Sequence, residues 1–428
     1  MNTTTRRLGA VALVSALGFG CAAATAATTA TAAAAAPAMP TDAAQPIDLP
    51  AAIRLALGQP RLRAAQHEVA ASLAGIEQAG RYPNPTLEYL REGEQAGTRT
   101  TTIQLNQPIE LGGKRQARVA LAQGEAALAR SELQVLRQEV RAEVVASFHG
   151  VLVAQERQAL AALLAELAGR SVDVAARQVA AGKVSPVDAT RARLAASEAR
   201  AELNTAGAEL ALARTRLGAL VGRPGESLRL ATSQDAALPS LAPLPLLRAR
   251  LADAAPLRRA RSAVAAHSAQ AQVERAARIP DLTLSVGSQR ADEVGRRQAV
   301  LGLSVPLPLF DRNSGRLGAA LRRADKAREE LAAAGTALAA DLEAAVTRYE
   351  AAKAEAALLR DEVIPDARTN HALTLKGFEH GKFAILDVLE AQRTLAQAQA
   401  RQWSALARAW QAYADIERMT SGDAAQQD

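Results

Sequence analysis

The feature of this 428-residue chain that most restricts its fold is an internal duplication. A proline-flanked segment from Arg81 to Arg118 returns in altered form from Arg278 to Arg316. The spacing between matching residues is 197 for Pro83 and Pro280, 198 for Pro108 and Pro306 and for Leu133 and Leu331, and 199 for Gly182 and Gly381 and for Asp188 and Asp387. A spacing that drifts by only two residues over about a hundred positions indicates an internal repeat.

Each copy of the repeated segment has the pattern of a β-hairpin, with strands in about 85–107 and 281–305. Apolar and polar residues alternate, which places Leu87 with Tyr89, and Ile103 with Leu105, on one face of the first hairpin. The other face carries Thr86, Glu88, Thr102, Gln104 and Asn106. The second hairpin alternates in the same way, with Leu282, Leu284, Val286, Leu301, Leu303 and Val305 on its apolar face. Two isolated hairpins are unstable in water, so other strands must complete the sheet.

The rest of the chain has the composition of long packed helices. Hydrophobic residues make up 49% of it but aromatic residues only 3%. Leu121, Leu128, Leu133, Leu136, Val140, Val144 and Phe148 recur at helical spacing. The pattern predicts helices at about 49–57, 62–80, 112–181, 187–221, 314–376 and 385–419, the fifth interrupted or bent at Pro365. The fold class is therefore mainly α with a small β part.

The repeat divides the chain into two units, residues 47–222 and 247–420, with a Pro-rich connector at 223–246 and a loose polar tail at 421–428. Residues 1–26 read as an export signal, with Arg6 and Arg7 before an apolar run and small residues at 24–26. Residues 27–46 are Ala/Thr/Pro-rich and expected to be flexible. Cys21, the only cysteine, is either a lipid acceptor or is discarded with the signal.

No apolar run of transmembrane length follows the signal. Amphipathic hairpins can still enter a membrane as a closed β-barrel. Four strands per chain are too few, because even a small barrel needs about eight. The strand count therefore implies an oligomer, and three chains would supply twelve strands.

The repeated hairpins, the Gly-Lys helical turns and the run ILDVLEAQRTLAQAQA at 385–400 resemble the outer membrane factor family typified by the TolC channel. The resemblance covers nearly the whole chain after the signal. The segment QPIELGGKRQAR at 107–118 further resembles the subfamily serving cobalt-zinc-cadmium and nickel efflux systems. Drug-exporting members more often carry Glu-Leu-Asp-Leu-Trp/Phe-Gly there.

The resemblance implies a TolC-like homotrimer in the outer membrane of a Gram-negative bacterium. Its twelve-stranded β-barrel would continue into a coiled-coil α-helical tunnel across the periplasm. The protein would be a passive exit duct for cobalt, zinc, cadmium or nickel, without a cofactor or chemistry of its own. It would work with a periplasmic adaptor and a proton-driven inner-membrane pump of the RND type.

The resemblance also points to the two helical turns as the periplasmic end of the tunnel. Gly182, Lys183, Gly381 and Lys382 would form tips contacted by the adaptor, or would simply end the helices. Asp387 and Glu390, three residues apart, match carboxylates that line the tunnel entrance in the family, and three-fold symmetry would make two acidic rings that attract cations. The alternative is that they complement the dipole at the helix N-terminus. Phe383 stands where TolC has an arginine that helps lock the entrance, so closure by packing replaces a salt-bridge latch as the expectation.

Other functions find less support in the sequence. The net charge of +7 is spread along helices, which indicates solvated surface rather than nucleic-acid binding. The histidines lack the paired spacing of a metal site and read as ordinary surface or core residues: His67, His149, His267, His371 and His380. Trp403, Trp410 and Tyr413 read as packing residues, and Tyr82 and Tyr89 as membrane-interface residues.

Three alternatives remain open. The same duct could carry drugs, other organic compounds or a secreted polypeptide, since cargo choice belongs mainly to the pump. A periplasmic coiled-coil scaffold without a pore would need one helical hairpin among β-domains, whereas this chain has two hairpin-and-helix units. An enzyme is disfavoured because no nucleophile elbow, phosphate loop or metal-ligand motif occurs.

Overall fold

The computed structural model describes residues 46–93, 98–182, 184–225, 228–230, 238–293, 295–380 and 382–420. The predicted signal with Cys21, residues 27–45 of the predicted flexible segment, and the tail 421–428 lie outside these residues.

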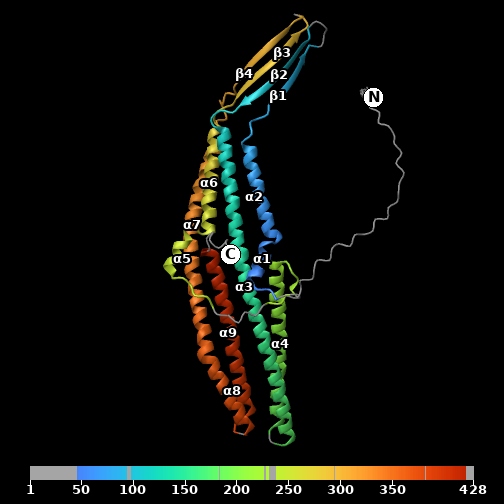
Figure 1. Ribbon diagram of the computed structural model, residues 1–428, viewed down its shortest axis with the longest axis vertical. Coiled ribbons are helices and arrows are strands. Elements are labelled where there is room, and N and C mark those ends of the chain that lie inside the picture. The colour runs from blue at the N-terminus through green and yellow to red at the C-terminus, as the bar shows by residue number, and fades with distance from the viewer. Residues whose placement is uncertain are drawn as a thin grey trace, which may run out of the picture. The chain divides into compact units, whose positions relative to one another are not determined.

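The two predicted hairpins are present and together form one antiparallel sheet. Strands β1 (Thr86–Glu92) and β2 (Thr100–Ile109) make the first hairpin, and β3 (Leu282–Ala291) and β4 (Arg297–Ser304) the second. The strand order is β1-β2-β3-β4, so β2 pairs with β3 and each hairpin extends the sheet of the other. Figure 1 shows this sheet beyond the ends of α2, α3, α6 and α7.

The register of the sheet confirms the predicted apolar and polar faces. One row of directly opposed residues runs across all four strands through Leu87, Leu105, Val286 and Leu301. These side chains are solvent-exposed in the single chain, Leu87 at 73% and Leu301 at 78%. On the opposite face, the Glu88 carboxylate accepts hydrogen bonds from Gln104 Nε2 at 2.6 Å and Asn106 Nδ2 at 2.9 Å. The sheet therefore presents an uncovered apolar face and a hydrogen-bonded polar face.

The first repeat contains α1 (Leu49–Leu57), α2 (Pro60–Ala79), α3 (Lys114–Ala180) and α4 (Pro186–Val221). Helix α3 has 67 residues, which corresponds to roughly 100 Å. Its predicted apolar stripe is part of the core, where Leu133, Val140 and Phe148 pack among residues of α1, α2 and α4. A helix of this length is stabilised by packing along its side rather than by its ends.

The second repeat contains α5 (Leu244–Leu251), α6 (Ala255–Ala276), α7 (Ser314–Leu358), α8 (Ile364–Glu379) and α9 (Ile385–Thr420). Its core joins α5, α7 and α9 around Tyr349, which is fully buried and donates its hydroxyl hydrogen to the carbonyl of Pro239. Burial raises the pKa of Tyr349 to about 12, assisted by the charge of Glu350.

The predicted interruption of the long second-repeat helix is confirmed as a five-residue π-helical turn, Leu359–Val363, just before Pro365. Proline lacks an N–H and its ring crowds the carbonyl four residues earlier, so the helix cannot continue regularly through it. A π turn widens the backbone locally and accommodates the break. The first repeat has no proline in α3, and that helix is continuous.

The repeats are joined along α3, which packs against α2 and α4 of the first repeat and against α6 and α9 of the second (Figure 1). His149 of α3 stacks on Trp410 of α9, and Trp410 makes an edge contact with Tyr413. The packing role predicted for Trp410 and Tyr413 is thereby confirmed. Among the described residues, no helix combines the length and the apolar character needed to cross a membrane.

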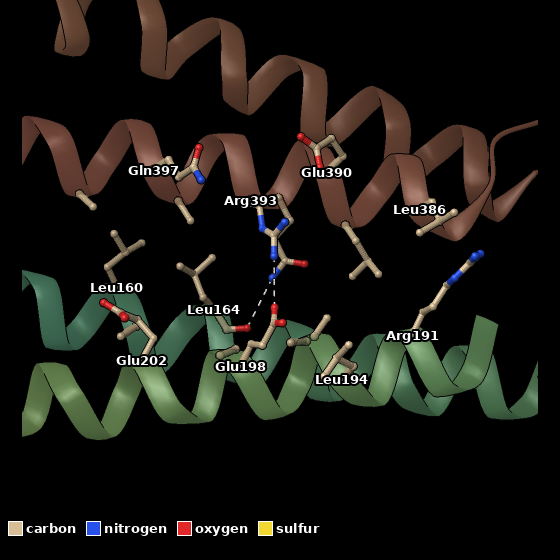
Figure 2. A pocket seen from close by; sticks show the side chains of 18 of the residues that line it. Leu160, Leu164, Arg191, Leu194, Glu198, Glu202, Leu386, Glu390, Arg393 and Gln397 are labelled. Atoms are coloured by element: carbon tan, nitrogen blue, oxygen red, sulfur yellow. Dashed lines mark hydrogen bonds and ion pairs between the residues drawn. The ribbon is translucent and has the colours of Figure 1, made fainter. Parts of the chain in front are cut away.

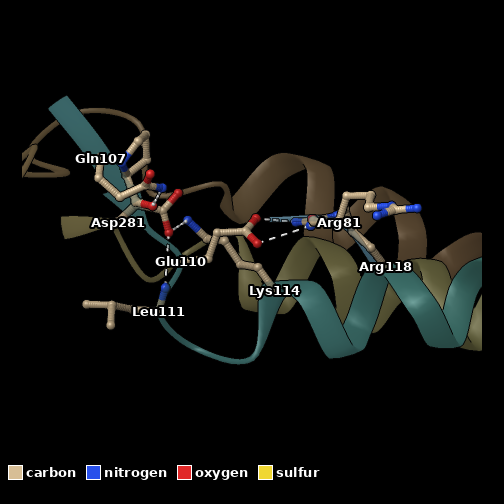
Figure 3. A network of polar contacts seen from close by, with 8 residues as sticks. Arg81, Gln107, Glu110, Leu111, Lys114, Arg118 and Asp281 are labelled. Carbon is tan, nitrogen blue, oxygen red and sulfur yellow. Dashed lines mark hydrogen bonds and ion pairs between the residues drawn. The ribbon is translucent and has the colours of Figure 1, made fainter. Parts of the chain in front are cut away.

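A polar network braces the corner where β2 turns into α3 (Figure 3). Lys114 Nζ lies 2.7 Å from Asp281 Oδ1, and the Leu111 N–H donates to the same carboxylate oxygen at 3.2 Å. Glu110 pairs with Arg118, whose Nη2 also donates to the carbonyl of Arg81 at 3.2 Å. Because Asp281 precedes β3, this corner ties the first repeat to the start of the second hairpin.

Two glycines are required by the backbone conformation at the same corner. Gly112 and Gly113 both have positive φ, 68° and 73°, which residues with a Cβ rarely adopt. A Cβ at Gly112 would also lie 2.6 Å from Cδ1 of Ile279. The segment QPIELGGKRQAR is therefore a tight strand-to-helix corner packed against the second repeat.

Candidate functional site at the helical turns

The α3–α4 turn contains the first predicted tip. Gly182 has φ 69°, and a Cβ there would meet nothing within 4 Å, so the backbone conformation alone requires glycine. Ser185 caps α4, since the Val187 N–H donates to Ser185 Oγ at 3.2 Å. Lys183 lies outside the described residues. The exposed backbone at Gly182 is open to a partner.

The α8–α9 turn contains the second predicted tip. Lys382 is exposed, and its N–H donates to the carbonyl of Gly377 at 2.8 Å, while Gly381 lies outside the described residues. The ring of Phe383 packs against Gly377, where a side chain would collide with it. Phe383 remains 50% exposed. It therefore fixes the shape of its own turn and still offers an apolar surface at the tip.

Asp387 has a structural role at the start of α9. Its Oδ2 accepts from the Ala384 N–H at 2.9 Å, and its own N–H donates to the Ala384 carbonyl at 3.1 Å. Side chains at the third helical position commonly reach back to the cap residue in this way. In the first repeat the equivalent cap is Ser185, whereas Ala384 has no side chain that can cap. The alternative interpretation of Asp387 as a helix-terminal charge is thus supported by geometry.

Glu390 lies one turn further along α9 and lines a groove of about 560 Å³ between α3, α4 and α9. The groove has apolar walls formed by Leu160, Leu164, Leu194, Leu386 and Leu389. Figure 2 shows Leu160, Leu164, Leu194 and Leu386 together with charged residues on both sides of the groove. Asp387 is exposed but is not among the lining residues, so the two carboxylates contribute to different local surfaces.

An ion pair spans this groove and joins the repeats. Arg393 Nη2 of α9 lies 3.2 Å from Glu198 Oε2 of α4, as Figure 2 shows. Below it, the largely buried Gln392 donates from Nε2 to the carbonyl of Leu164 at 3.4 Å. Neither Arg393 nor Glu198 was predicted from the sequence. Residues this far apart in sequence share no spacing that could have indicated the pairing.

The histidines do not form a cluster with other metal-ligand residues in the part of the chain that the structure describes. His149 is buried, and burial lowers its pKa from 6.5 to about 4, while burial also lowers the pKa of His371. Within the part of the chain that the structure describes, no three residues of His, Cys, Asp or Glu are grouped as metal ligands would be. What the described site offers is a pair of exposed turns, carboxylates beside them and an apolar groove.

The model of the Outer membrane efflux protein family matches residues 53–223 and 246–422, one copy for each repeat. The chain belongs to this family. The chain is 42% identical over 381 residues to the Cobalt-zinc-cadmium resistance protein CzcC of Cupriavidus metallidurans. The match covers 89% of this chain and 91% of that protein. The chain is also 30% identical over 270 residues to the Nickel-cobalt-cadmium resistance protein NccC of Alcaligenes xylosoxydans xylosoxydans, covering 61% of each chain.

Solved structures share the fold of this outer membrane efflux protein. The outer membrane protein VceC of Vibrio cholerae matches with a TM-score of 0.73 at 20% identity, over 87% of this chain and 96% of that chain. The CmeC outer membrane channel of Campylobacter jejuni matches with a TM-score of 0.76 at 13% identity, over 87% of this chain and 85% of that chain. The outer membrane factor family and the TolC-like fold class predicted from the sequence are thereby confirmed.

Proposed function

We propose that this outer membrane efflux protein is a passive exit duct for divalent heavy-metal cations: cobalt, zinc, cadmium and nickel. The observation that supports this cargo is the 42% identity to a cobalt-zinc-cadmium resistance protein along nearly the full length of both chains. The duct receives its cargo from a proton-driven inner-membrane pump of the RND type, through a periplasmic adaptor. Selectivity resides mainly in the pump, and the duct binds ions only weakly because they must leave quickly.

The duct is a homotrimer in the outer membrane. Three copies supply twelve strands, enough to close a barrel, whereas the four strands of one chain are too few. The exposed apolar row through Leu87 and Leu301 supports contact of this face with lipid. The long helices extend from the sheet into the periplasm and form the tunnel.

The tips of the tunnel contact the adaptor. Gly182 and Lys382 are exposed at the α3–α4 and α8–α9 turns, next to Lys183 and Gly381, which lie outside the described residues. The partly exposed ring of Phe383 adds an apolar anchor beside Lys382. Two small turns with nearby apolar and charged groups suit the ends of a helical partner.

Asp387 and Glu390 form acidic rings at the entrance when three-fold symmetry repeats them. The hydrogen bond that Asp387 accepts from Ala384 engages one carboxylate oxygen, Oδ2, so capping and cation attraction are compatible. Rings of like charge raise the local concentration of counter-ions.

Ion selectivity of the purified trimer in a planar bilayer tests the duct and the rings together. The wild-type protein should conduct and give a cation-selective reversal potential in a salt gradient. The double variant Asp387→Asn/Glu390→Gln removes both charges and keeps an oxygen acceptor for the Ala384 N–H, so it should conduct with a weaker cation preference. A matched variant, Asp325→Asn/Glu330→Gln on α7, should leave selectivity unchanged. Absence of any conductance would contradict the duct, and equal selectivity in all three would contradict the rings.

A further inference from the structure

The three basic residues of the four strands lie in one row across the sheet. They are Arg91 of β1, Arg290 of β3 and Arg297 of β4, and β2 contains none. The register places Thr101 of β2 between the two hairpins, opposite both Arg91 and Arg290. Arg290 in turn lies opposite Arg297. All three arginines are exposed, and together they form the arginine row.

The arginine row belongs to the apolar face of the sheet. Strand alternation puts Arg91 on the same side as Leu87, four residues earlier. The two acidic residues of the strands, Glu88 and Glu92, lie on the opposite, polar side. Positive charge on the strands is thus confined to the face that is proposed to contact lipid, and negative charge to the other.

The arginine row lies at the end of the sheet that is remote from the helices in the chain. The segments that connect the strands of each hairpin, residues 93–99 and 292–296, adjoin the row. The helices α2, α3, α6 and α7 join the strands at their opposite ends. With the helices in the periplasm, the row belongs to the outer leaflet of the outer membrane.

The height of the arginine row matches the edge of a membrane. Leu282 at the start of β3 and Arg290 are eight positions apart (290 − 282 = 8), which is about 27 Å along an extended strand. Strands of outer membrane barrels are tilted by about 35–45°, so the separation across the membrane is about 20 Å, close to an apolar band of about 25 Å. Tyr89, one row closer to the centre of this face, is 62% exposed, as expected of an interfacial aromatic residue.

The charges of the arginine row call for an anion. Arg290 and Arg297 are directly opposed, and like charges in that arrangement are destabilising. Within the described part of the chain, no ion pair joins any of the three arginines to a carboxylate. Guanidinium groups bind phosphate through two parallel hydrogen bonds, which makes arginine well suited to phosphate recognition.

We infer that the arginine row binds the phosphate groups of the glycolipid in the outer leaflet. This site rests on the proposed outer membrane duct, and it concerns the anchoring of the duct rather than the path of its cargo. A lipid fits better than an acidic protein because the row continues an apolar face. Acyl chains would lie against the row of Leu87 and Leu301 while the guanidinium groups meet the phosphates.

Binding of diphosphorylated lipid A to the purified full-length trimer in detergent tests this site, with bound lipid counted by native mass spectrometry. The wild-type protein should prefer this lipid over the same lipid without phosphates by about tenfold or more, the ratio expected from one charge-assisted hydrogen bond. Arg91→Gln/Arg290→Gln/Arg297→Gln should lose the preference. Arg297→Gln alone removes the like-charge opposition, so it should assemble normally and show a smaller preference than wild type.

A matched triple variant controls for a general loss of positive charge. It removes three exposed arginines of α2, α4 and α7 and should keep the wild-type preference: Arg63→Gln/Arg200→Gln/Arg323→Gln. Inorganic phosphate at the concentration of the lipid should not displace the lipid, because it lacks the acyl chains that contact the apolar face.

Equal binding of the phosphorylated and dephosphorylated lipids by a wild-type trimer would overturn the lipid site, leave the duct intact and point to an acidic protein as the partner of the row. Displacement of the lipid by equimolar inorganic phosphate would also overturn it, in favour of a site for free phosphate. Absence of the wild-type protein from the outer membrane fraction would instead overturn the proposed duct.

Discussion

The imidazole of His149 and the indole of Trp410 are stacked, with ring centroids 3.4 Å apart and planes 5° from parallel. His149 belongs to α3 in the first repeat and Trp410 to α9 in the second, so the stack is a direct contact between the repeats. His149 Nε2 is buried and has no hydrogen-bond partner in the structure. The ring is therefore held by packing, and it is stable there only in its neutral form.

Acid should lower the free energy of unfolding, because His149 is buried in its neutral form. An unfolded chain binds a proton at this residue near pH 6.5, whereas burial lowers the pKa in the folded chain to about 4. Between these values the unfolded state binds more protons, so the stabilisation is fully present above about pH 6.5 and is lost as the pH falls towards 4. By pH 5 the loss amounts to about 2 kcal/mol. Thermal unfolding of the purified protein at pH 7.5 and pH 5 measures it.

His149→Phe is the matched control because it keeps an aromatic ring against Trp410 and cannot titrate. Its melting temperature should fall less than that of wild type between the two pH values. An equal fall in both proteins would mean that other groups control the acid response.

The Lys114–Asp281 ion pair should contribute measurable stability, because Lys114 is only 18% exposed and the Asp281 carboxylate also accepts from the Leu111 N–H. Asp281→Asn is expected to destabilise the protein by about 1 to 2 kcal/mol. Asp311→Asn breaks the Arg316 pair, whose side chains are 71% and 76% exposed, and should have almost no effect. The denaturant midpoints of unfolding of the two variants should therefore differ. Equal midpoints would argue against a stabilising role for the Lys114–Asp281 pair at the β2–α3 corner.

Gly112→Ala should be more damaging than Gly113→Ala. Both substitutions force a Cβ into positive φ, at a cost of about 1 to 2 kcal/mol. Only the alanine at position 112 would also collide with Ile279, adding about 1 to 3 kcal/mol for overpacking. Melting temperatures and the yield of assembled protein rank the two, and similar losses would show that Ile279 moves aside freely.

The cap formed by Asp387 can be separated from its charge. Asp387→Ala removes the acceptor for the Ala384 N–H and should cost about 1 kcal/mol, whereas Asp387→Asn keeps an acceptor and should cost less. Glu390→Ala, one turn further along α9, serves as a control with little expected change, because Glu390 is exposed. Equal stability of all three variants would contradict the capping role.

Residue patterns predicted most of this fold because they reflect local geometry. Alternation in the hairpins placed Leu87 and Leu105 on one face, and the observed register puts them directly opposite each other. Helical spacing of Leu133, Val140 and Phe148 identified the buried stripe of α3. Pro365 marked the break in the second long helix because its effect on the backbone is independent of tertiary context.

Contacts between distant residues were not accessible from the sequence. Alternation cannot tell which strand lies beside β2, so the joining of both hairpins through β2 and β3 came only from the structure. The Arg393–Glu198 and Lys114–Asp281 pairs join residues of different repeats, and no spacing rule relates them. The capping role of Asp387 depends on the backbone at Ala384, which spacing alone does not reveal.

The central claim is best tested by the metal content of cells that lack this protein. Intracellular cobalt, zinc, cadmium and nickel would be measured in a deletion strain and in the same strain carrying the wild-type gene. The account predicts metal accumulation and metal sensitivity in the deletion strain, both reversed by the wild-type gene. Unchanged metal levels together with new sensitivity to drugs would contradict metal export and indicate a duct for organic compounds.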